Sequence, residues 1–283
     1  KMWYPASLTN FSIISSKCDL GEGLFVNGLA AAWVDINKSK IFLYKNSLIE
    51  FDVKNRPSVI YQMSEDILIF GSENGICKID LKNKTEELIN DITFSSNLNL
   101  KDFRSNDGGY CGNFQYLGFM HKNNPEKYSG YIFLIKDEKW ILIDNKIHIP
   151  NSFIDLGNNF LLISDSLSSE IWLFNFAADG ELKTKKIWRV LGGGQTPDGG
   201  CKIGEYIYLS MWDDNVINIY NLKGEYINNF KVPVLRPTNC KFDEYDSKLW
   251  ITSASCGLNK EQLSDFPESG NTFAYKLKNN EVC

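Results

Sequence analysis

The chain has few of the residues that build the common metal and disulfide sites. Only two histidines occur, His121 and His148, so a histidine-rich metal site is excluded. The seven cysteines are an odd number and contain no Cys-x-x-Cys pair, which argues against a zinc cluster or a disulfide framework. Several of them lie inside β-type runs, where free cysteine packs as a small hydrophobic residue. We therefore expect a reducing compartment and a cytoplasmic location, with the periplasm as the alternative.

Strong positive charge and long apolar runs are also missing. The net charge is −5 and the pI is about 5.3, without a basic stripe, so we expect no nucleic-acid partner. No apolar run approaches the roughly 18 residues that span a bilayer, so we expect no membrane partner. A chain of 283 residues can bury a sizeable core. We expect a single domain over residues 1–283, present as a monomer or a weak homodimer.

What the chain does have is a repeated β-type pattern. Each unit is an apolar run, a polar turn and a second run of aromatic or aliphatic residues, and the successive starts lie 36, 48, 45, 46 and 42 residues apart. That spacing is close to the length of a four-stranded propeller blade. The six units begin at Ala32, Leu68, Tyr116, Leu161, Ile207 and Leu249.

Six such units predict an all-β fold, a six-bladed β-propeller with four-stranded blades. The rival is a β-sandwich, which requires many short strands but no register at this period. The segment Phe11-Ser-Ile-Ile14 precedes the first unit. We expect it to add a strand to the last blade and close the ring, because closure removes an exposed sheet edge.

An oxygen-bearing side chain precedes each unit at nearly the same offset. The position nine or ten residues before each start is occupied by Glu22, Ser58, Asn106, Asn151, Asp198 and Asn239. Equivalent repeat positions lie on a ring about a propeller axis, so we expect these side chains at one mouth of the central channel. Asp198 stands in a Pro-Asp-Gly sequence that predicts a tight turn.

Carboxylate and amide oxygens are the ligands that hard divalent cations take in proteins. The ring therefore predicts one divalent metal ion at the channel mouth. Ca²⁺ is the ion we expect first, and Zn²⁺, Mn²⁺ or Mg²⁺ are alternatives. Turns before strands are also rich in Asn and Asp, which leaves a purely structural interpretation open.

Seven short motifs resemble the gluconolactonase, regucalcin (senescence marker protein) and luciferin-regenerating family of six-bladed propellers. They run in the family's order across roughly residues 18 to 255. The motifs are Leu20-Gly-Glu-Gly23, Trp33-Val-Asp-Ile36, Arg104-Ser-Asn-Asp-Gly108, Ile149-Pro-Asn151, Ser164-Asp-Ser166, Pro197-Asp-Gly199 and Arg236-Pro-Thr-Asn-Cys240.

The resemblance implies a role for each matching position. Glu22, Asn151 and Asp198 would bind the metal, and Asp198 would also be the catalytic acid and base. Arg104 and Asn106 would contact the substrate, with Asn106 also a candidate contact of the metal. Family members hydrolyse sugar lactones with a bound divalent ion, so we expect a gluconolactonase-like carboxylic ester hydrolase acting on a small sugar lactone. The alternatives are a related phosphotriesterase-type hydrolase and a non-catalytic metal-binding propeller.

The chain departs from the family pattern at several points. Ser152 replaces the glycine after Pro-Asn, and the loop His121-Lys-Asn-Asn124 stands where some relatives carry acidic residues that hold the sugar. We expect His121 to contact the substrate from this loop. Two further residues have open roles: Asp165 is either structural or catalytic, and Trp212 either packs within its blade or walls the pocket.

Overall fold

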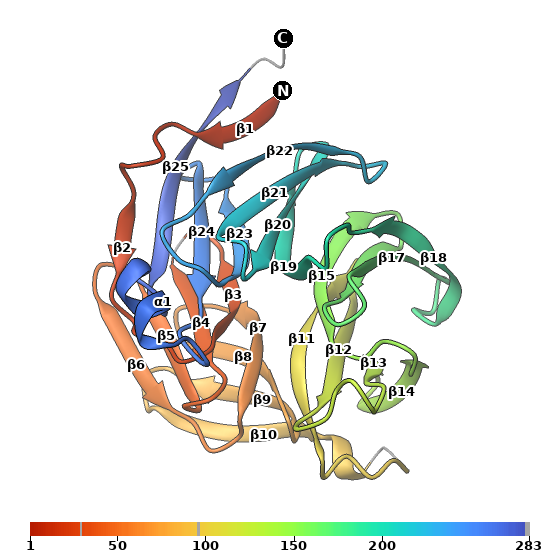
Figure 1. Cartoon of the computed structure of the whole chain (residues 1–283). Helices are drawn as coiled ribbons and strands as arrows, with labels where there is room; N and C mark the ends of the chain where they lie inside the picture. Colours follow the sequence, from red (N-terminus) through yellow and green to blue (C-terminus); the bar gives the residue numbers. More distant parts are fainter. Residues whose placement is uncertain (29, 95–96, 281–283) are drawn as a thin grey trace.

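The structure, a computed structural model, describes residues 1–28, 30–94 and 97–280, and it is built almost entirely of β-strands (Figure 1). Within these residues, the first five blades are antiparallel sheets of four strands that follow one another along the chain. Blade one contains β3 (Gly21–Val26), β4 (Ala31–Asp35), β5 (Lys40–Tyr44) and β6 (Leu48–Asp52). Blade two contains β7 (Pro57–Met63), β8 (Ile67–Ser72), β9 (Gly75–Asp80) and β10 (Thr85–Asp91).

The next three blades repeat this arrangement. Blade three contains β11 (Phe103–Cys111), β12 (Phe114–His121), β13 (Tyr131–Lys136) and β14 (Lys139–Asp144). Blade four contains β15 (Pro150–Gly157), β16 (Phe160–Asp165), β17 (Glu170–Phe176) and β18 (Leu182–Val190). Blade five contains β19 (Thr196–Ile203), β20 (Tyr206–Trp212), β21 (Val216–Asn221) and β22 (Tyr226–Lys231).

Blade six joins the two ends of the described chain. It contains β23 (Pro237–Asp243), β24 (Lys248–Ser253) and β25 (Thr272–Asn280), and β25 pairs with both β1 (Met2–Pro5) and β2 (Ser12–Ile14) (Figure 1). In the antiparallel register, Ser12 lies opposite Ala274 and Trp3 lies opposite Asn279. The predicted closure by Phe11–Ile14 is confirmed, with β1 as an additional strand.

The first strand of each blade lies innermost. Neighbouring innermost strands contact one another in chain order, and β23 contacts β3, which closes the ring. One buried apolar cluster fills each interface between neighbouring blades: Tyr116 and Phe174, for example, share the cluster between blades three and four. The six-bladed propeller predicted from the repeat is therefore confirmed.

Helices are minor in the described residues. The helix α1 (Lys260–Asp265) lies between β24 and β25 and begins with a capping box, in which Asn259 accepts from the Gln262 backbone N–H. The 3₁₀ turn η1 (Ile92–Phe94) follows β10. Over the part of the chain that the structure describes, no helix has the length and apolar character required to cross a membrane.

The blade registers correct one local prediction. The apolar runs used to count the repeat form the second and third strands of each blade, and a further strand precedes them. Pro197, Asp198 and Gly199 accordingly lie inside the innermost strand β19 and not in a tight turn before it. The ring residues therefore sit within the innermost strands, where a backbone irregularity directs their side chains.

Candidate functional site

Each innermost strand contains a β-bulge at the same height. The pairing with the second strand shifts between Glu22 and Phe25 in blade one and between Pro197 and Gly200 in blade five, and the other four blades shift at the corresponding place. A bulge adds a residue to one strand and redirects side chains. The residue that enters each bulge is the last paired residue in blades one and four and the first unpaired residue in the other four blades. We call these six residues, Glu22, Ser58, Asn106, Asn151, Asp198 and Thr238, the bulge positions.

Five of these positions match the predicted ring, and the sixth does not. Counting at a fixed offset selected Asn239, but the register places Thr238 first in the bulge of blade six and pairs Asn239 with Thr252. The offset is longer in blade six, where the turn between β23 and β24 spans residues 244–247, than in blade five, where the turn between β19 and β20 spans residues 204–205. Thr238 donates its hydroxyl to the Gly21 carbonyl, so it ties blade six to blade one.

Four bulge positions meet in one pocket at the N-terminal ends of the innermost strands. Glu22, Asn106, Asn151 and Asp198 line this cavity of about 260 Å³ together with Arg104. We call it the channel pocket. Ser58 does not line it; its hydroxyl is buried and lies 3.4 Å from the Gly71 carbonyl of its own blade.

Two carboxyl groups are buried side by side in the channel pocket. Glu22 and Asp198 are each 5% exposed and are hydrogen-bonded to each other, so they share a proton when no cation is present. Burial raises the pKa of Glu22 well above its ordinary range, and the neighbouring Asp198 charge raises it further. Burial likewise raises the pKa of Asp198 to about 7. Asp198 Oδ1 has no hydrogen-bond partner among the described residues although it is buried.

The remaining polar side chains form a framework around this pair. The Asn151 amide nitrogen donates to Ser166 Oγ at 3.2 Å, and its oxygen accepts from the Ser152 N–H at 3.2 Å. Arg104 Nη1 donates to Asn106 Oδ1 at 2.9 Å. The Asn106 amide nitrogen donates to the Pro150 carbonyl at 3.0 Å, which fixes the Arg104 guanidinium against the pocket floor.

Arg104 is the cation of the pocket. Burial lowers its pKa to about 10, and the charges of Glu22 and Asp198 oppose that shift. The side chain therefore stays protonated at neutral pH. One guanidinium beside two carboxylates and two amides leaves the pocket with excess negative charge once both carboxyls ionise.

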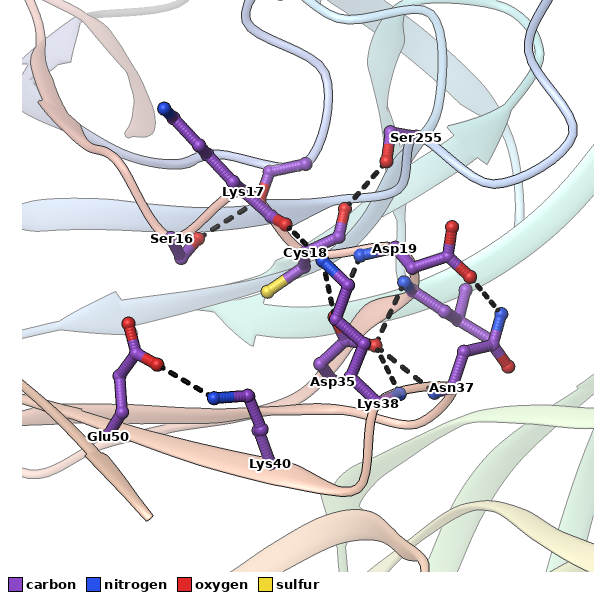
Figure 2. Close-up of polar contacts among 12 residues, drawn as sticks. Ser16, Lys17, Cys18, Asp19, Asp35, Asn37, Lys38, Lys40, Glu50 and Ser255 are labelled. Carbon is purple, nitrogen blue, oxygen red and sulfur yellow. Dashed lines mark hydrogen bonds and ion pairs between the residues drawn. The ribbon is translucent and has the colours of Figure 1, made fainter. Parts of the chain in front are cut away.

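Two aspartates, Asp35 and Asp165, hold the segments that lead into the bulges. The buried Asp35 carboxylate accepts the backbone N–H groups of Asp19 at 2.8 Å and Leu20 at 3.2 Å, immediately before Glu22 (Figure 2). It also accepts those of Asn37 and Lys38, both at 3.1 Å, across its own turn (Figure 2).

Asp165 repeats this arrangement in blade four. Its carboxylate accepts the backbone N–H groups of His148 at 3.0 Å and Ile149 at 3.1 Å, two residues before Asn151. Of the two roles left open for Asp165, the structure supports the structural one. An aspartate ends the second strand of both blades, as Asp35 in blade one and Asp165 in blade four. This repetition in the sequence was a signal for the structural role.

Ser152 follows Asn151 in a left-handed backbone conformation, with φ of 79°. This conformation favours glycine, so a side chain here is strained unless contacts compensate for it. The Ser152 hydroxyl contacts Ser164 Oγ and donates to the Asp198 carbonyl at 2.6 Å. The substitution thus links the bulges of blades four and five by a hydrogen bond that glycine cannot make.

The structure separates His121 from the other predicted site residues. His121 is buried, and its Nδ1 accepts the backbone N–H groups of Asn123 at 3.2 Å and Asn124 at 3.0 Å. The ring also stacks on Tyr128 with centroids 4.6 Å apart. These contacts organise the loop after β12, and His121 does not line the channel pocket.

Several pocket residues were not predicted from the sequence. Trp212 does line the channel pocket, as one of its two expected roles required, and it is joined by Leu20, Met120, Ile149, Thr196 and Ser166. Leu20, Ile149 and Thr196 each stand two residues before a bulge position, so the repeat contained a signal for them. Met120 and Trp212 are the cross-strand partners of Arg104 and Thr196, which only the register reveals.

The residues that follow the bulge positions of blades three and six face a separate cavity of about 350 Å³, at the opposite ends of the innermost strands. Asp107 and Asn239 line it, and each has a buried side-chain oxygen without a hydrogen-bond partner among the described residues. Burial raises the pKa of Asp107 to about 7, although the Lys241 ammonium opposes the shift. Lys241 Nζ donates to the Gly200 carbonyl at 2.7 Å.

The donor set of the channel pocket fits a hard divalent cation. Two buried carboxyls, an amide oxygen and the unpartnered Asp198 Oδ1 supply oxygen ligands and the charge to neutralise such an ion. A cluster of three or more His, Cys, Asp or Glu side chains suited to a metal ion is absent from the described residues. Among the described residues, neither His nor Cys lines the channel pocket, so Zn²⁺ sites rich in nitrogen and sulfur are a poorer match than oxygen-rich sites.

Relatives of known name match parts of the chain. The regucalcin of Gallus gallus is 32% identical over 118 residues, which are 38% of this chain and 38% of the relative. That of Oryctolagus cuniculus is 26% identical over 185 residues, or 61% of this chain and 62% of the relative. The chain thus matches less than two thirds of the length of these relatives.

Solved structures with the same fold match over nearly the whole chain. A structure described as a calcium-binding protein, regucalcin, from Agrobacterium tumefaciens has a TM-score of 0.86 at 20% identity and covers 95% of this chain and 96% of its own. A luciferin-regenerating enzyme has a TM-score of 0.82 at 16% identity, with 96% and 97% covered. A protein described as a putative gluconolactonase has a TM-score of 0.71 at 14% identity, with 97% and 95% covered.

The family model described as the SMP-30/Gluconolactonase/LRE-like region matches residues 20–255. This range contains all six bulge positions and the residues that line the channel pocket. The chain belongs to the SMP-30/gluconolactonase/LRE-like family.

Proposed function

We propose that this protein is a divalent-metal-dependent hydrolase that opens lactones at the channel pocket. The observation that carries the proposal is the buried Glu22–Asp198 pair, in which Asp198 Oδ1 has no hydrogen-bond partner within the described part of the chain. Two buried carboxylates without a neutralising cation are costly, and a divalent ion removes that cost. Family membership supports the reaction type.

Glu22, Asn151 and Asp198 would hold the ion, with Ca²⁺ first and Mg²⁺, Mn²⁺ or Zn²⁺ as alternatives. When bound, such an ion supplies a Lewis acid that polarises a lactone carbonyl and stabilises the developing oxyanion. The ordered framework of Ser166 and Ser152 holds Asn151 and the Asp198 backbone in place.

Asp198 would exchange the proton in this mechanism. Its carboxylate takes a proton from the attacking water and returns it to the ring oxygen as the ester bond breaks. Arg104 would donate hydrogen bonds to the substrate, and Asn106 would orient Arg104 through the 2.9 Å contact described above. The carbonyl carbon gains the water oxygen, and the products are a carboxylate and an alcohol on one molecule.

The substrate that the sequence predicts is a small sugar lactone. We also propose one domain over residues 1–283, acting in the cytoplasm as a monomer or a weak homodimer. The six cysteines within the described residues are free thiols, as in reducing compartments.

A pH-indicator assay tests the proposal. The protein is treated with EDTA, and Ca²⁺, Mg²⁺, Mn²⁺ or Zn²⁺ is added back to a panel of lactones, with spontaneous hydrolysis subtracted. We expect metal-restored turnover in the wild type and in the Glu205→Gln control, which changes an exposed carboxylate. The Glu22→Gln and Asp198→Asn variants should lose it. Turnover of phosphotriesters alone, or metal binding without any turnover, would overturn the proposal.

A further inference from the structure

The wall of the channel pocket is apolar above its polar floor. Leu20, Met120, Ile149 and Trp212 come from four different blades and surround the space over Glu22 and Asp198. Each lies two residues before a bulge position or across the ladder from such a residue. Leu20, Met120, Ile149 and Trp212, which we call the apolar wall, are thus the apolar part of one layer of the propeller, and Arg104 and Thr196 are the polar pocket residues of the same layer.

Most polar groups of the pocket are already engaged within the protein. Ser166 Oγ donates to the Pro197 carbonyl at 2.6 Å and accepts from Asn151. Both amide atoms of Asn106 are in hydrogen bonds, and Arg104 Nη1 binds the Ser105 carbonyl at 3.0 Å as well as Asn106. Besides the carboxylates, the remaining nitrogens of Arg104 and the Thr196 hydroxyl are left for a ligand.

An aldonolactone presents hydroxyl groups around its ring. Each hydroxyl requires a hydrogen-bond partner in the protein when it is transferred out of water. A buried hydroxyl without a partner weakens binding about 5- to 150-fold. Beside the apolar wall only Arg104 and Thr196 offer such partners, fewer than the hydroxyls of an aldonolactone, whereas the wall gains from contact with CH₂ groups. The cavity of about 260 Å³ is at the small end of ligand pockets, which suits one ring with a short substituent.

The side chain of Trp212, the largest of the apolar wall, is held in place by Arg236. The Arg236 guanidinium lies over the Trp212 indole, 4.5 Å from the ring centroid. Arg236 is fixed in turn by Asp213, with Nε 2.5 Å from Oδ1, and by a hydrogen bond to the Cys256 carbonyl. A rigid aromatic surface of this kind is preorganised for an apolar ligand.

We infer that the preferred substrate is a γ- or δ-lactone that carries a short apolar chain, and that Leu20, Met120, Ile149 and Trp212 bind the chain. This inference rests on the proposed lactone hydrolysis, and it replaces the sugar lactone expected from the sequence with an alkyl-substituted lactone. The ring ester reaches the carboxylate pair at the floor, and the chain lies along the wall.

The first test compares metal-loaded wild-type protein on lactones of equal ring size. δ-Hexalactone and δ-octalactone are set against glucono-δ-lactone, and we expect kcat/KM at least 10-fold higher for the alkyl lactones. A higher kcat/KM for glucono-δ-lactone would overturn the inference and leave the proposed function intact. Absence of turnover on every lactone with every metal would reject the proposed function itself.

Two variants assign the effect to the wall. Trp212→Ala should raise KM for δ-octalactone about 10- to 100-fold, because a large apolar contact is lost, and should change kcat much less. Trp188→Ala is the matched control, because it removes an indole from the outer strand β18. Met120→Gln keeps the side-chain length and should shift the preference about 10-fold toward glucono-δ-lactone. Equal KM values for Trp212→Ala and wild type would contradict the assignment.

A binding measurement is independent of turnover. Calorimetry with an alkyl-substituted δ-lactam, which resists hydrolysis, should show binding to the wild type and to Trp188→Ala. The affinity should fall about 10-fold or more in Trp212→Ala. Equal affinity in all three proteins would overturn the inference even if alkyl lactones are hydrolysed.

Discussion

Four of the six bulge positions direct a side chain into the channel pocket, and the other two direct a hydroxyl into the protein. Glu22, Asn106, Asn151 and Asp198 line the pocket, whereas Ser58 and Thr238 hydrogen-bond to the backbone carbonyls of Gly71 and Gly21. The backbone is irregular in the same way at all six. The identity of the side chain therefore decides whether a bulge builds the site or joins parts of the scaffold.

The four bulge positions in the channel pocket and the two others, Ser58 and Thr238, which we call the scaffold group, are expected to differ most in their effect on turnover. Asp198→Asn should lower kcat/KM about 10²–10⁴-fold, because it removes both the proton acceptor and a charged ligand. In the scaffold group, Thr238→Val should leave kcat/KM within about threefold and cost about 1–3 kcal/mol of stability, because the Gly21 carbonyl loses its partner. Steady-state kinetics and urea unfolding measure the two effects. A larger loss of turnover for Thr238→Val than for Asp198→Asn would abolish the distinction.

The next largest effect concerns the stability of the fold, because Gly199 in blade five is packed closely against Asn239. A Cβ at Gly199 would overlap the Asn239 side chain, so Gly199→Ala should destabilise the fold by about 1–3 kcal/mol. The double variant Gly199→Ala, Asn239→Ala should recover part of that loss. Gly192→Ala is the control: no atom lies within 4 Å of its Cβ, and its stability should change by less than about 0.5 kcal/mol. Chemical denaturation of all four proteins tests this steric account.

The buried carboxyls predict how the stability of the metal-free protein depends on pH. Burial raises the pKa values of Asp107 and Asp198 to about 7 in the folded state. Between about pH 4 and pH 7 the folded chain therefore holds protons that the unfolded chain has released. The contribution of these protonated carboxyls to the free energy of unfolding is fully present below the pKa that they have in the unfolded chain, and it is lost as the pH rises toward 7. The loss is at most about 1.4 kcal/mol per pH unit for each group.

Urea unfolding in EDTA across pH 4.5 to 8 measures this dependence. Asp107→Asn should reduce the slope, because one of the buried carboxyls with a raised pKa no longer titrates, while the channel pocket keeps its donor set. Saturating metal should remove most of the Asp198 contribution, because the ion favours the charged carboxylate. A stability that rises with pH in EDTA would be the opposite of the expected sign.

The smallest effect is expected at Ser58. Its hydroxyl lies 3.4 Å from the Gly71 carbonyl, which is long for an O–H···O hydrogen bond. Ser58→Ala should therefore cost less than about 1 kcal/mol and leave metal affinity unchanged. Asn151→Ala at the equivalent position of blade four should weaken metal binding about 10- to 100-fold. Titration calorimetry of the two variants gives a matched comparison of one scaffold position and one pocket position.

The sequence was sufficient to predict the propeller, because the second and third strands of each blade are apolar runs that recur along the chain at a nearly constant spacing. The same spacing identified Glu22, Asn106, Asn151 and Asp198, which the structure brings together in one pocket. The family motifs at residues 104–108 and 197–199 added Arg104 and the expected roles. Ligation and catalysis by these residues remain predictions.

The misplaced details have specific physical causes. Thr238 was missed because the turn that follows the innermost strand is longer in blade six than in blade five, and a single sequence does not mark where the strand ends and the turn begins. His121 was expected at the substrate because it opens a loop that was expected over the channel mouth, but its Nδ1 accepts the backbone N–H groups of Asn123 and Asn124 instead. The pocket wall depends on cross-strand partners such as Met120, and these follow from register alone.

The pairing of β25 with β1 and β2 sets an order of events in folding. Trp3 cannot pair before Asn279 has been made, and Ser12 cannot pair before Ala274 has been made. Within the propeller, β1 and β2 therefore precede all other strands along the chain but pair only once β25 is present. Contacts of such large sequence separation form slowly. Until they form, blade six presents the edge of β25 to other chains, and dimers that exchange these strands become accessible. The same closure that protects the mature ring thus makes its final step the one most exposed to misassembly.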